Sequence, residues 1–242
     1  MIKGKKMLVV SAHAADFVWR SGGTIAKYIK EGAEVTVVVL SFGVRGESND
    51  LWKQPDATAE SVKEIRKGET LAAAEILNIK NIEFWDLVDY PMQFNSELEE
   101  RMVRKIRETQ PDIILTHDRF DYLNPDHNRV SEFVFECSVI SNSSGVRLEG
   151  TKVTKQMRIF GFEPHQTEMS NFKPDSIIDI TDVYEQKIAA MKCFKAQSHL
   201  IEYYTQRAFM RGNHARRVSG NNSYKYAESF ANFFPFAGPE LY

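Results

Sequence analysis

The stretch that decides the fold is Lys5–Gly23, which reads K-K-M-L-V-V-S-A-H-A-A-D-F-V-W-R-S-G-G. It begins with an apolar run of strand length, continues into a loop with His13 and Asp16, and ends at a Gly-Gly pair. A short helix pattern follows over residues 24–32. The basic start and apolar run could mimic a signal peptide, but the run is too short and ends in two ionisable residues. We expect a buried first strand that leads into a functional loop.

Strand and helix patterns alternate through the first half of the chain. Further strands are expected over residues 34–42, 82–87 and 112–117, and helices over residues 60–79 and 96–110. Ser61 with Glu64, and Ser96 with Glu99, have the spacing of capping boxes at the two helix starts. The β-branched run over 34–42 is too uniformly apolar for a strand with one exposed face, which indicates a strand buried on both faces. This rhythm predicts an α/β fold with a doubly wound (Rossmann-like), mostly parallel sheet.

The second half is less regular but shows no linker, repeat or low-complexity tract, so a single domain over residues 1–242 is expected. Helices are predicted near 128–139, over 182–197 and over 200–212, and strands over 157–163 and 176–180. The segment Ser219–Tyr242 is rich in aromatic residues. We expect it to pack on the domain or on a neighbouring subunit.

Composition narrows the possible functions. The 242 residues are 43% hydrophobic and 26% charged, as in a globular protein, and no apolar stretch is long enough for a membrane span. A net charge of −2 and a pI near 6.3 argue against nucleic acid as a partner. Two cysteines, Cys137 and Cys193, lie among apolar neighbours and are expected to be buried free thiols. These features favour the cytoplasm.

Ionisable residues follow each of five successive expected strands. They are His13 and Asp16; Arg45 and Glu47; Asp86, Asp89 and Tyr90; His117, Asp118, Asp121, Asp126 and His127; and Glu163 and His165. In an open parallel sheet, ligands bind beyond the carboxyl ends of the strands. The joint placement of these groups at one edge therefore predicts a catalytic site.

Three of these residues form a candidate metal site. Catalytic zinc takes three protein ligands from His, Asp and Glu and leaves a fourth position open. His13 and Asp16 lie three apart in one loop, and His127 comes from a separate loop at the same edge. Alternatively, His13 caps the following helix and Asp126 with His127 simply begins another.

The sequence resembles the LmbE-like, or PIG-L, family of zinc-dependent de-N-acetylases. Residues Ser11–Gly23 are similar to the family's Ala-His-Pro-Asp-Asp-Glu motif with its later Gly-Gly, and Asn124–His127 to its Pro-Asp-His motif. The resemblance spans most of the chain. It implies an LmbE-like fold, one Zn²⁺ per chain held by His13, Asp16 and His127, and assembly into a homo-oligomer.

Two departures from the family motifs affect the expected chemistry. The position of the aspartate that activates water in the deacetylases is Ala15, and a histidine that stabilises the oxyanion is replaced by Asn124. A general base contributes about 10²–10⁴-fold to a rate, so an efficient deacetylase without it is not expected. The retained ligands indicate different chemistry on the same metal.

A closer similarity is to the 4-oxalomesaconate hydratase branch of the family. It rests on S-A-H-A-A-D-F-V-W-R, S-F-G-V-R-G-E-S, D-Y-P, F-E-P-H-Q and E-Y-Y-T. It implies a zinc-dependent hydratase that adds water across a C=C bond of an unsaturated oxo-tricarboxylic acid, in the meta-cleavage catabolism of aromatic acids. Glu47 and His165 are the candidates for proton transfer, with acid and base unassigned; each could instead be a structural loop residue.

A small anionic substrate needs cations and hydrogen-bond donors. The candidates are Arg20, Arg45, Tyr204, Arg207 and Arg211, although the arginines could equally form a solvated basic face. Two alternatives to the hydratase stay open at this point. One is a zinc-dependent de-N-acetylase of an amino-sugar conjugate, and the other is a metal-binding protein without catalysis.

Overall fold

The computed structural model describes residues 2–238, so Met1 and residues 239–242 of the domain expected over 1–242 lie outside it. The strands are β1 (Lys6–Ser11), β2 (Glu34–Val39), β3 (Asn81–Phe84), β4 (Ile113–His117), β5 (Arg158–Phe162), β6 (Ser176–Asp179) and β7 (Ala227–Asn232). The α-helices are α1 (Asp16–Lys30), α2 (Ala59–Ile76), α3 (Ser96–Thr109), α4 (Pro125–Ser141), α5 (Tyr184–Met191) and α6 (Leu200–Ser219). Short 3-10 turns are η1 (Leu51–Lys53), η2 (Thr181–Val183) and η3 (Lys195–Gln197).

The strands of this part of the chain join one sheet in the order β3-β2-β1-β4-β5-β7-β6. The first five in that order are parallel, while β7 runs antiparallel to both of its neighbours. The predicted doubly wound, mostly parallel sheet is confirmed. The chain leaves β1 toward β2 on one side and later returns to β4 on the other, which makes the β1–β4 boundary the point where ligands bind in such sheets.

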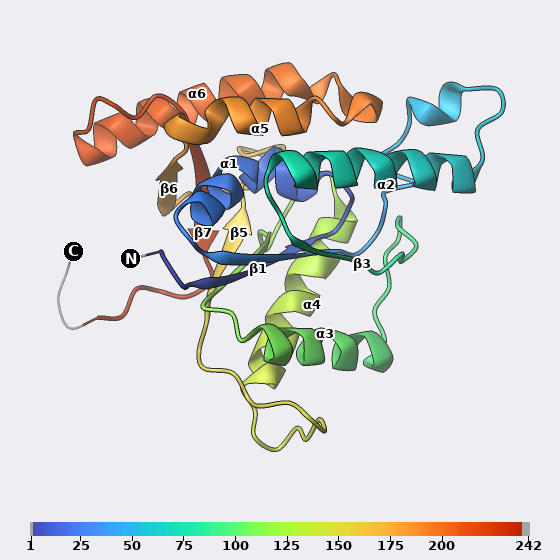
Figure 1. Ribbon diagram of the computed structural model, residues 1–242, viewed down its shortest axis with the longest axis vertical. Helices are drawn as coiled ribbons and strands as arrows, with labels where there is room; N and C mark the ends of the chain where they lie inside the picture. The colour runs from blue at the N-terminus through green and yellow to red at the C-terminus, as the bar shows by residue number, and fades with distance from the viewer. Residues whose placement is uncertain (1, 239–242) are drawn as a thin grey trace.

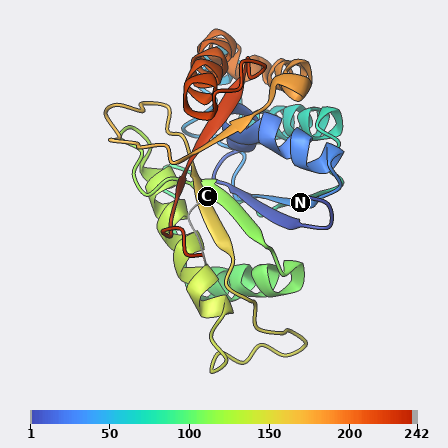
Figure 2. The ribbon, with the colours of Figure 1, turned by 90° about the vertical axis from the view of Figure 1, so that its left-hand side faces the viewer.

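Helices cover both faces of the sheet (Figures 1 and 2). In Figure 1, α1, α2, α5 and α6 lie above it, and α3 and α4 lie below. Both faces of strand β1 are buried, which explains its apolar run. Its Met7 and Val9 pack into the core under the first layer, and Leu8 and Val10 pack into the core under the second. The two cores hold the end of β1, and the loop after it, in a fixed position.

Helix α1 begins at Asp16, several residues before the start that the Gly-Gly pair suggested. The acidic side chain in the first turn suits the positive end of the helix dipole. Gly23 lies inside the helix, where a Cβ would meet Ile180 Cδ1 at 2.6 Å. The glycine therefore serves close packing against residue 180 and does not begin the helix.

Two predicted helix caps were wrong by a few residues. Thr58 caps α2 and forms a reciprocal box with Ser61, and Asn95 caps α3 by accepting from the N–H of Leu98. Thr58 and Asn95 both have the extended backbone that a cap requires, whereas Ser61 and Ser96 already lie within their helices.

The aromatic segment after α6 contains a strand that the sequence reading missed. Residues Ala227–Asn232 form β7, which inserts between β5 and β6. Strand pairing within the same domain therefore accounts for part of the packing expected of residues 219–242, whose last four lie outside the described residues.

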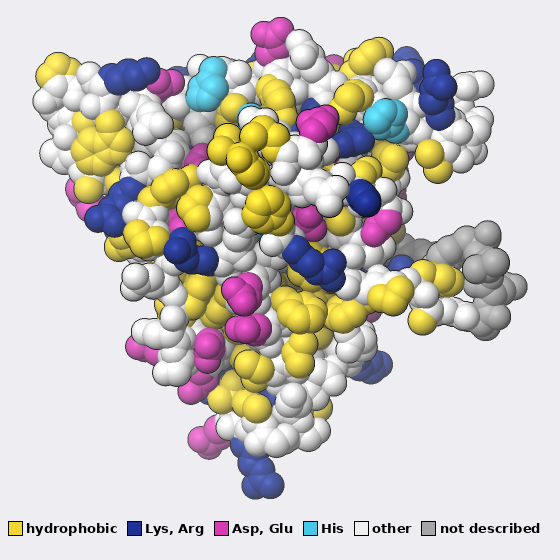
Figure 3. Space-filling view, turned by 180° about the vertical axis from the view of Figure 1, so that it is seen from behind, with side chains coloured by type: hydrophobic (Ala, Val, Ile, Leu, Met, Phe, Trp, Pro, Cys, Tyr) yellow, Lys and Arg dark blue, Asp and Glu magenta, His cyan; other side chains and the backbone are white. Residues whose placement is uncertain are grey.

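The two cysteines were expected to be buried free thiols. Cys137 and Cys193 are both free, but only Cys137 is fully buried. Acidic and basic side chains are interspersed among hydrophobic ones on the face shown in Figure 3. Within residues 2–238, none of the helices has the length and apolar character needed to cross a bilayer.

Candidate metal centre and active-site cavity

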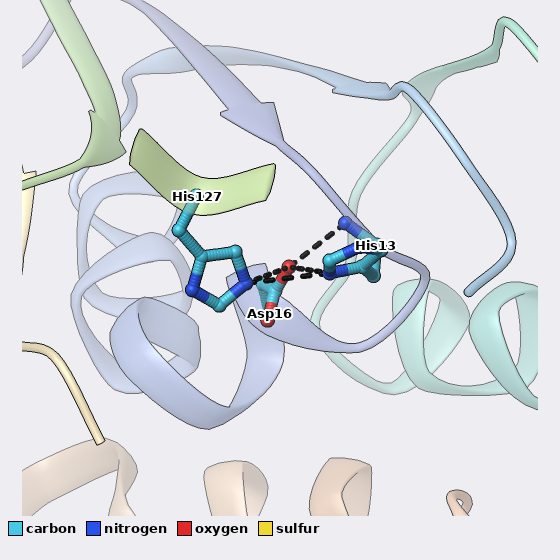
Figure 4. A group of neighbouring side chains, drawn as sticks. All are labelled: His13, Asp16 and His127. Carbon is cyan, nitrogen blue, oxygen red and sulfur yellow. Dashed lines mark hydrogen bonds and ion pairs between the residues drawn. The ribbon is translucent and has the colours of Figure 1, made fainter. Parts of the chain in front are cut away.

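The three predicted metal ligands lie together at the β1–β4 boundary (Figure 4). His13 lies in the loop after β1, Asp16 begins α1, and His127 lies in the first turn of α4, just after the β4 loop. All three side chains are buried. The doubly wound topology thus brings together residues more than a hundred positions apart.

The ligand atoms form a nearly equilateral triangle. His13 Nδ1 lies 3.3 Å from Asp16 Oδ2 and 3.3 Å from His127 Nε2, and the third edge, His127 Nε2 to Asp16 Oδ2, is 3.4 Å. A tetrahedral zinc with bonds of about 2.0–2.1 Å has ligand–ligand edges of about 3.3–3.4 Å. The donor set and its spacing therefore fit a zinc-type ion with one coordination position left for water or substrate.

The outer nitrogens of both histidines face carboxylates. His127 Nδ1 lies 2.9 Å from Asp121 Oδ2, and His13 Nε2 lies 3.4 Å from Asp126 Oδ2. Asp126 is itself fixed by the backbone N–H groups of Tyr90 and Met92, each at 2.8 Å. Carboxylates in this position orient metal-binding imidazoles and raise their basicity.

The electrostatics of the cluster favour a cation at its centre. Burial lowers the pKa of His13, but hydrogen bonds and charge from Asp126, Asp16 and Glu47 overcome it and raise that pKa to about 10. The pKa of Asp16 lies well below its ordinary value despite burial, because His127, His13 and His117 surround it. The carboxylates thus attract positive charge to the position that a metal would take.

Glu47 lies beside the metal triad. Its Oε1 is 3.8 Å from His13 Nδ1. The turn that brings it there depends on Gly43, which has φ +69° and where a Cβ would meet Glu47 Cβ at 2.9 Å and His13 Cβ at 3.3 Å. The carboxylate accepts hydrogen bonds from Asn124 at 2.9 Å, Gln197 at 3.1 Å and the Tyr90 hydroxyl at 3.4 Å.

A cavity of about 220 Å³ opens over the triad. The residues that line it are Asp16, Trp19, Arg20, Glu47, Tyr90, Asp121, Leu123, Asn124, His127, His165, Gln166, Gln197, His199, Leu200 and Tyr204. The structure thus brings the two proposed proton-transfer residues, Glu47 and His165, to one cavity with two of the predicted metal ligands, Asp16 and His127. Two of the proposed substrate-binding residues, Arg20 and Tyr204, line the same cavity.

Arg20 is the buried cation of this cavity. Its guanidinium lies 3.4 Å from Asp121 Oδ2 and 3.7 Å from Asp16 Oδ1, and it donates to the Glu163 carbonyl at 2.9 Å. Tyr204 is buried beside it, and burial raises the pKa of the phenol, so it stays protonated. The cavity wall therefore offers a fixed positive charge from Arg20 and a buried hydroxyl donor from Tyr204.

His165 lies half-buried in the loop after β5 and stacks on Tyr203 with ring centroids 4.1 Å apart. Burial, with Arg20 and Arg207 nearby, lowers the pKa of His165 to about 4. The imidazole is therefore neutral near pH 7 and is able to accept a proton.

Arg207 and Arg211, which were expected to bind substrate, contact the loop that carries His165, and their role in substrate binding stays a prediction. Arg207 donates to the carbonyls of Pro164 at 2.7 Å and His165 at 2.6 Å. Arg211 forms a bidentate pair with Glu163 at 2.8 and 2.5 Å. Neither lines the cavity, and their donors are already occupied.

Arg45 was also expected to bind substrate, but it lies exposed and outside the cavity lining. Its backbone N–H donates to Asp89, and its guanidinium reaches only the Tyr90 carbonyl at 3.5 Å. Of the other expected rim residues, Asp86 pairs with Lys63 at the surface. The buried His117 accepts from the Ala12 N–H and stacks on His127 at 3.9 Å.

Sequence reasoning missed Gln197 and recognised Asn124 only as a departure from the family motif. No motif surrounds Gln197, which lies in a short turn between two helices. A weak signal did exist in its partner Arg66, which sits on the buried stripe of α2 with Val62, Thr70 and Ala73. A polar residue on an apolar helix face often indicates a specific buried contact.

Comparisons with known proteins show which sequences this chain resembles. The sequence profile of the family described as PIG-L, GlcNAc-PI de-N-acetylase, matches residues 8–138. The chain is 42% identical over 234 residues to a 4-oxalmesaconate hydratase of Pseudomonas putida, covering 96% of this chain and 90% of that protein. It is 27% identical to a diacetylchitobiose deacetylase of Thermococcus kodakarensis, covering 80% and 70%.

Solved structures give the same order of similarity. The crystal structure of a 4-carboxy-2-hydroxymuconate hydratase from Pseudomonas putida superposes with a TM-score of 0.94 at 41% identity, covering 98% of this chain and all of that one. An N,N'-diacetylchitobiose deacetylase from Pyrococcus horikoshii has a TM-score of 0.79 at 24% identity, covering 95% and 84%, and so shares the fold.

Proposed function

We propose that this chain, which belongs to the PIG-L family, is a metal-dependent hydratase, a hydro-lyase of aromatic-compound catabolism. Its substrate is an unsaturated oxo-tricarboxylic acid of the 4-oxalmesaconate type. The observation that carries this proposal is a complete metal triad with Glu47 beside it, in a site with Ala15 and Asn124 at the two positions expected to serve amide hydrolysis. Near full-length similarity to a hydratase supports it.

The proposed ion is Zn²⁺, one per chain, held by His13, Asp16 and His127. A zinc ion bound there supplies Lewis acidity that polarises an oxygen atom of the reactants. The matching ligand spacing and the two outer carboxylates support this choice.

We assign the proton transfers of the reaction to side chains of the protein. Hydration places the oxygen of water on one alkene carbon, takes one proton from that water and adds a proton to the other carbon. Glu47 and His165 line the cavity and are the groups placed to take and to deliver these protons. Their order is left open, although the neutral His165 begins as an acceptor.

The cavity walls hold the substrate carboxylates. Arg20 contributes a fixed positive charge, while Tyr204 and the side-chain amides contribute neutral donors. A small anionic substrate fits a cavity of about 220 Å³. The cytoplasmic location, the homo-oligomer and the absence of nucleic-acid and membrane partners stay predictions from sequence.

The test is an absorbance assay of zinc-loaded protein with 4-oxalmesaconate, comparing wild type with Glu47→Ala. We expect metal-dependent loss of the conjugated chromophore and a fall in kcat/KM of about 10²–10⁴-fold in the variant. Glu75→Ala, on the exposed face of α2, is the matched control and should retain full activity. Acetate release from an N-acetylated amino-sugar conjugate, without turnover of 4-oxalmesaconate, would contradict the proposal and favour a deacetylase.

A further inference from the structure

Each oxygen of the Glu47 carboxylate accepts a hydrogen bond from a different side-chain amide. Asn124 Nδ2 donates to Oε1 at 2.9 Å, and Gln197 Nε2 donates to Oε2 at 3.1 Å. The two amides come from distant parts of the chain, since Asn124 precedes α4 and Gln197 ends η3. The carboxylate is therefore fixed in rotation as well as in position.

The direction of each amide is determined by a second partner. Asn124 Oδ1 accepts from the backbone N–H of His127 at 3.3 Å, as the cap of α4. Gln197 Oε1 accepts from Arg66 Nη2 at 2.8 Å. Guanidinium and backbone N–H groups only donate, so each amide oxygen must face them and each NH₂ must face Glu47.

Arg66 is fully buried, which is costly for a charged side chain unless it is paired. It donates to Glu69 Oε2 at 2.9 Å, and the other oxygen of Glu69 accepts from the N–H of Ala196 at 3.0 Å. The Arg66–Glu69 pair thus ties helix α2 to Ala196 and Gln197 of the η3 turn. A chain of hydrogen bonds from Arg66 through Gln197 therefore connects helix α2 with the Glu47 carboxylate.

We propose that Gln197, oriented by Arg66, and Asn124 are positioning residues that hold Glu47 in its reactive orientation beside the metal triad. The inference rests on the proposed function, in which Glu47 transfers a proton. It also accounts for asparagine at position 124, where the sequence departs from the family motif. The same side chain caps α4, which carries His127, and places Glu47 next to that ligand.

The first test is Gln197→Met, which keeps the length of the side chain but removes both the donor to Glu47 and the acceptor of Arg66. We expect kcat to fall about 10–100-fold while KM changes less than about threefold, because misplacing a reacting group by about 1 Å can cost about 10²-fold. Metal content should match that of the wild type, whereas the midpoint of thermal unfolding should fall, because the buried Arg66 loses the acceptor that Gln197 provides. Gln206→Met, on the exposed side of α6, is the matched control with unchanged kinetics.

The decisive measurement is a double-mutant cycle with Glu47→Ala. If Gln197 acts through Glu47, adding Gln197→Met to Glu47→Ala should cause little further loss of the residual activity. Equal fold-losses in both backgrounds, or a rise in KM with kcat unchanged, would assign Gln197 to direct substrate binding and overturn the inference.

Asn124→Asp tests the second amide without disturbing the helix cap. The aspartate keeps the oxygen that accepts from His127 but turns a second acceptor toward Glu47, so kcat should again fall with the metal retained. Wild-type kcat in this variant would overturn the part assigned to Asn124. Wild-type protein that fails to hydrate 4-oxalmesaconate would overturn the proposed function, whereas active wild type with an additive cycle overturns only this inference.

Discussion

At the scale of single residues, the metal site depends on which nitrogen of each histidine faces inward. His13 presents Nδ1 and His127 presents Nε2, and in each case the opposite nitrogen faces a carboxylate. A histidine that used the other nitrogen would break the triangle with Asp16. Asp121 and Asp126 therefore orient the two histidines of the candidate metal site.

Asp121→Asn should lower the affinity for zinc about 10–100-fold, since the amide no longer supplies the negative charge that orients His127 and raises its basicity. Competition with a chromophoric chelator measures the affinity directly. Asp182→Asn, at an exposed position, is the control. Unchanged zinc affinity in Asp121→Asn would show that Arg20 and the helix start alone orient His127.

At the scale of elements, the residues just outside each helix determine where it begins. Helix α3 has Ser96, Glu97 and Glu99 in its first turn, but Asn95 is the residue with extended backbone and a side-chain bond to Leu98 N at 3.0 Å. Asn95 and its neighbour Ser96 are therefore expected to contribute differently to stability.

Asn95→Ala should destabilise the protein by about 1 kcal/mol, because the cap hydrogen bond is lost, whereas Ser96→Ala should be close to neutral. Urea unfolding followed by circular dichroism measures both. Hydratase kinetics should be unchanged in either variant, since α3 lies on the face of the sheet away from the cavity-lining residues of α1 and α6 (Figure 1). The reverse order of stabilities would place the cap at Ser96.

At the scale of the whole molecule, a buried ion pair joins the strand β7 to two helices. Lys187 Nζ lies 2.5 Å from Glu228 Oε1 and 3.0 Å from the Trp19 carbonyl. The Glu228 carboxylate also accepts from the backbone N–H groups of Gly23 at 2.9 Å and Thr24 at 2.7 Å. Strand β7, α5 and the middle of α1 therefore meet at one charged centre.

Lys187→Met should cost about 3–5 kcal/mol of unfolding free energy, because it leaves the Glu228 carboxylate buried without its cation. Adding Glu228→Gln should recover part of this loss, since the remaining group is then neutral. Chemical denaturation of the single and double variants gives the comparison. Additive losses in the double variant would show that packing, and not charge, accounts for the cost.

Much of this architecture could be predicted from local sequence. The runs at β1 and β2 are apolar on both faces, so they had to lie between two helix layers, and this dictates a doubly wound sheet. Once β1 and β4 are neighbours, the loops after them must meet, and His13, Asp16 and His127 follow. Each of these inferences needs only the spacing of apolar residues along the sequence and the common direction of parallel strands.

Contacts between distant side chains could not be read in the same way. Gln197 reaches Glu47 across 150 positions, and Arg211 reaches Glu163 across 48, so neither has a local spacing that reveals it. Strand β7 was missed because its run A-E-S-F-A-N carries the polar side chain of Glu228, whose burial makes sense only opposite Lys187.

The sequence alone predicted the alternating elements and the three residues of the candidate metal site, because both depend on periodicity and on loops that follow expected strands. Only the tertiary structure decided which arginine faces the cavity and which amides hold Glu47. The physical reason is that a guanidinium or an amide binds whichever acceptor the packed chain brings within about 3 Å, and packing is a property of the whole molecule.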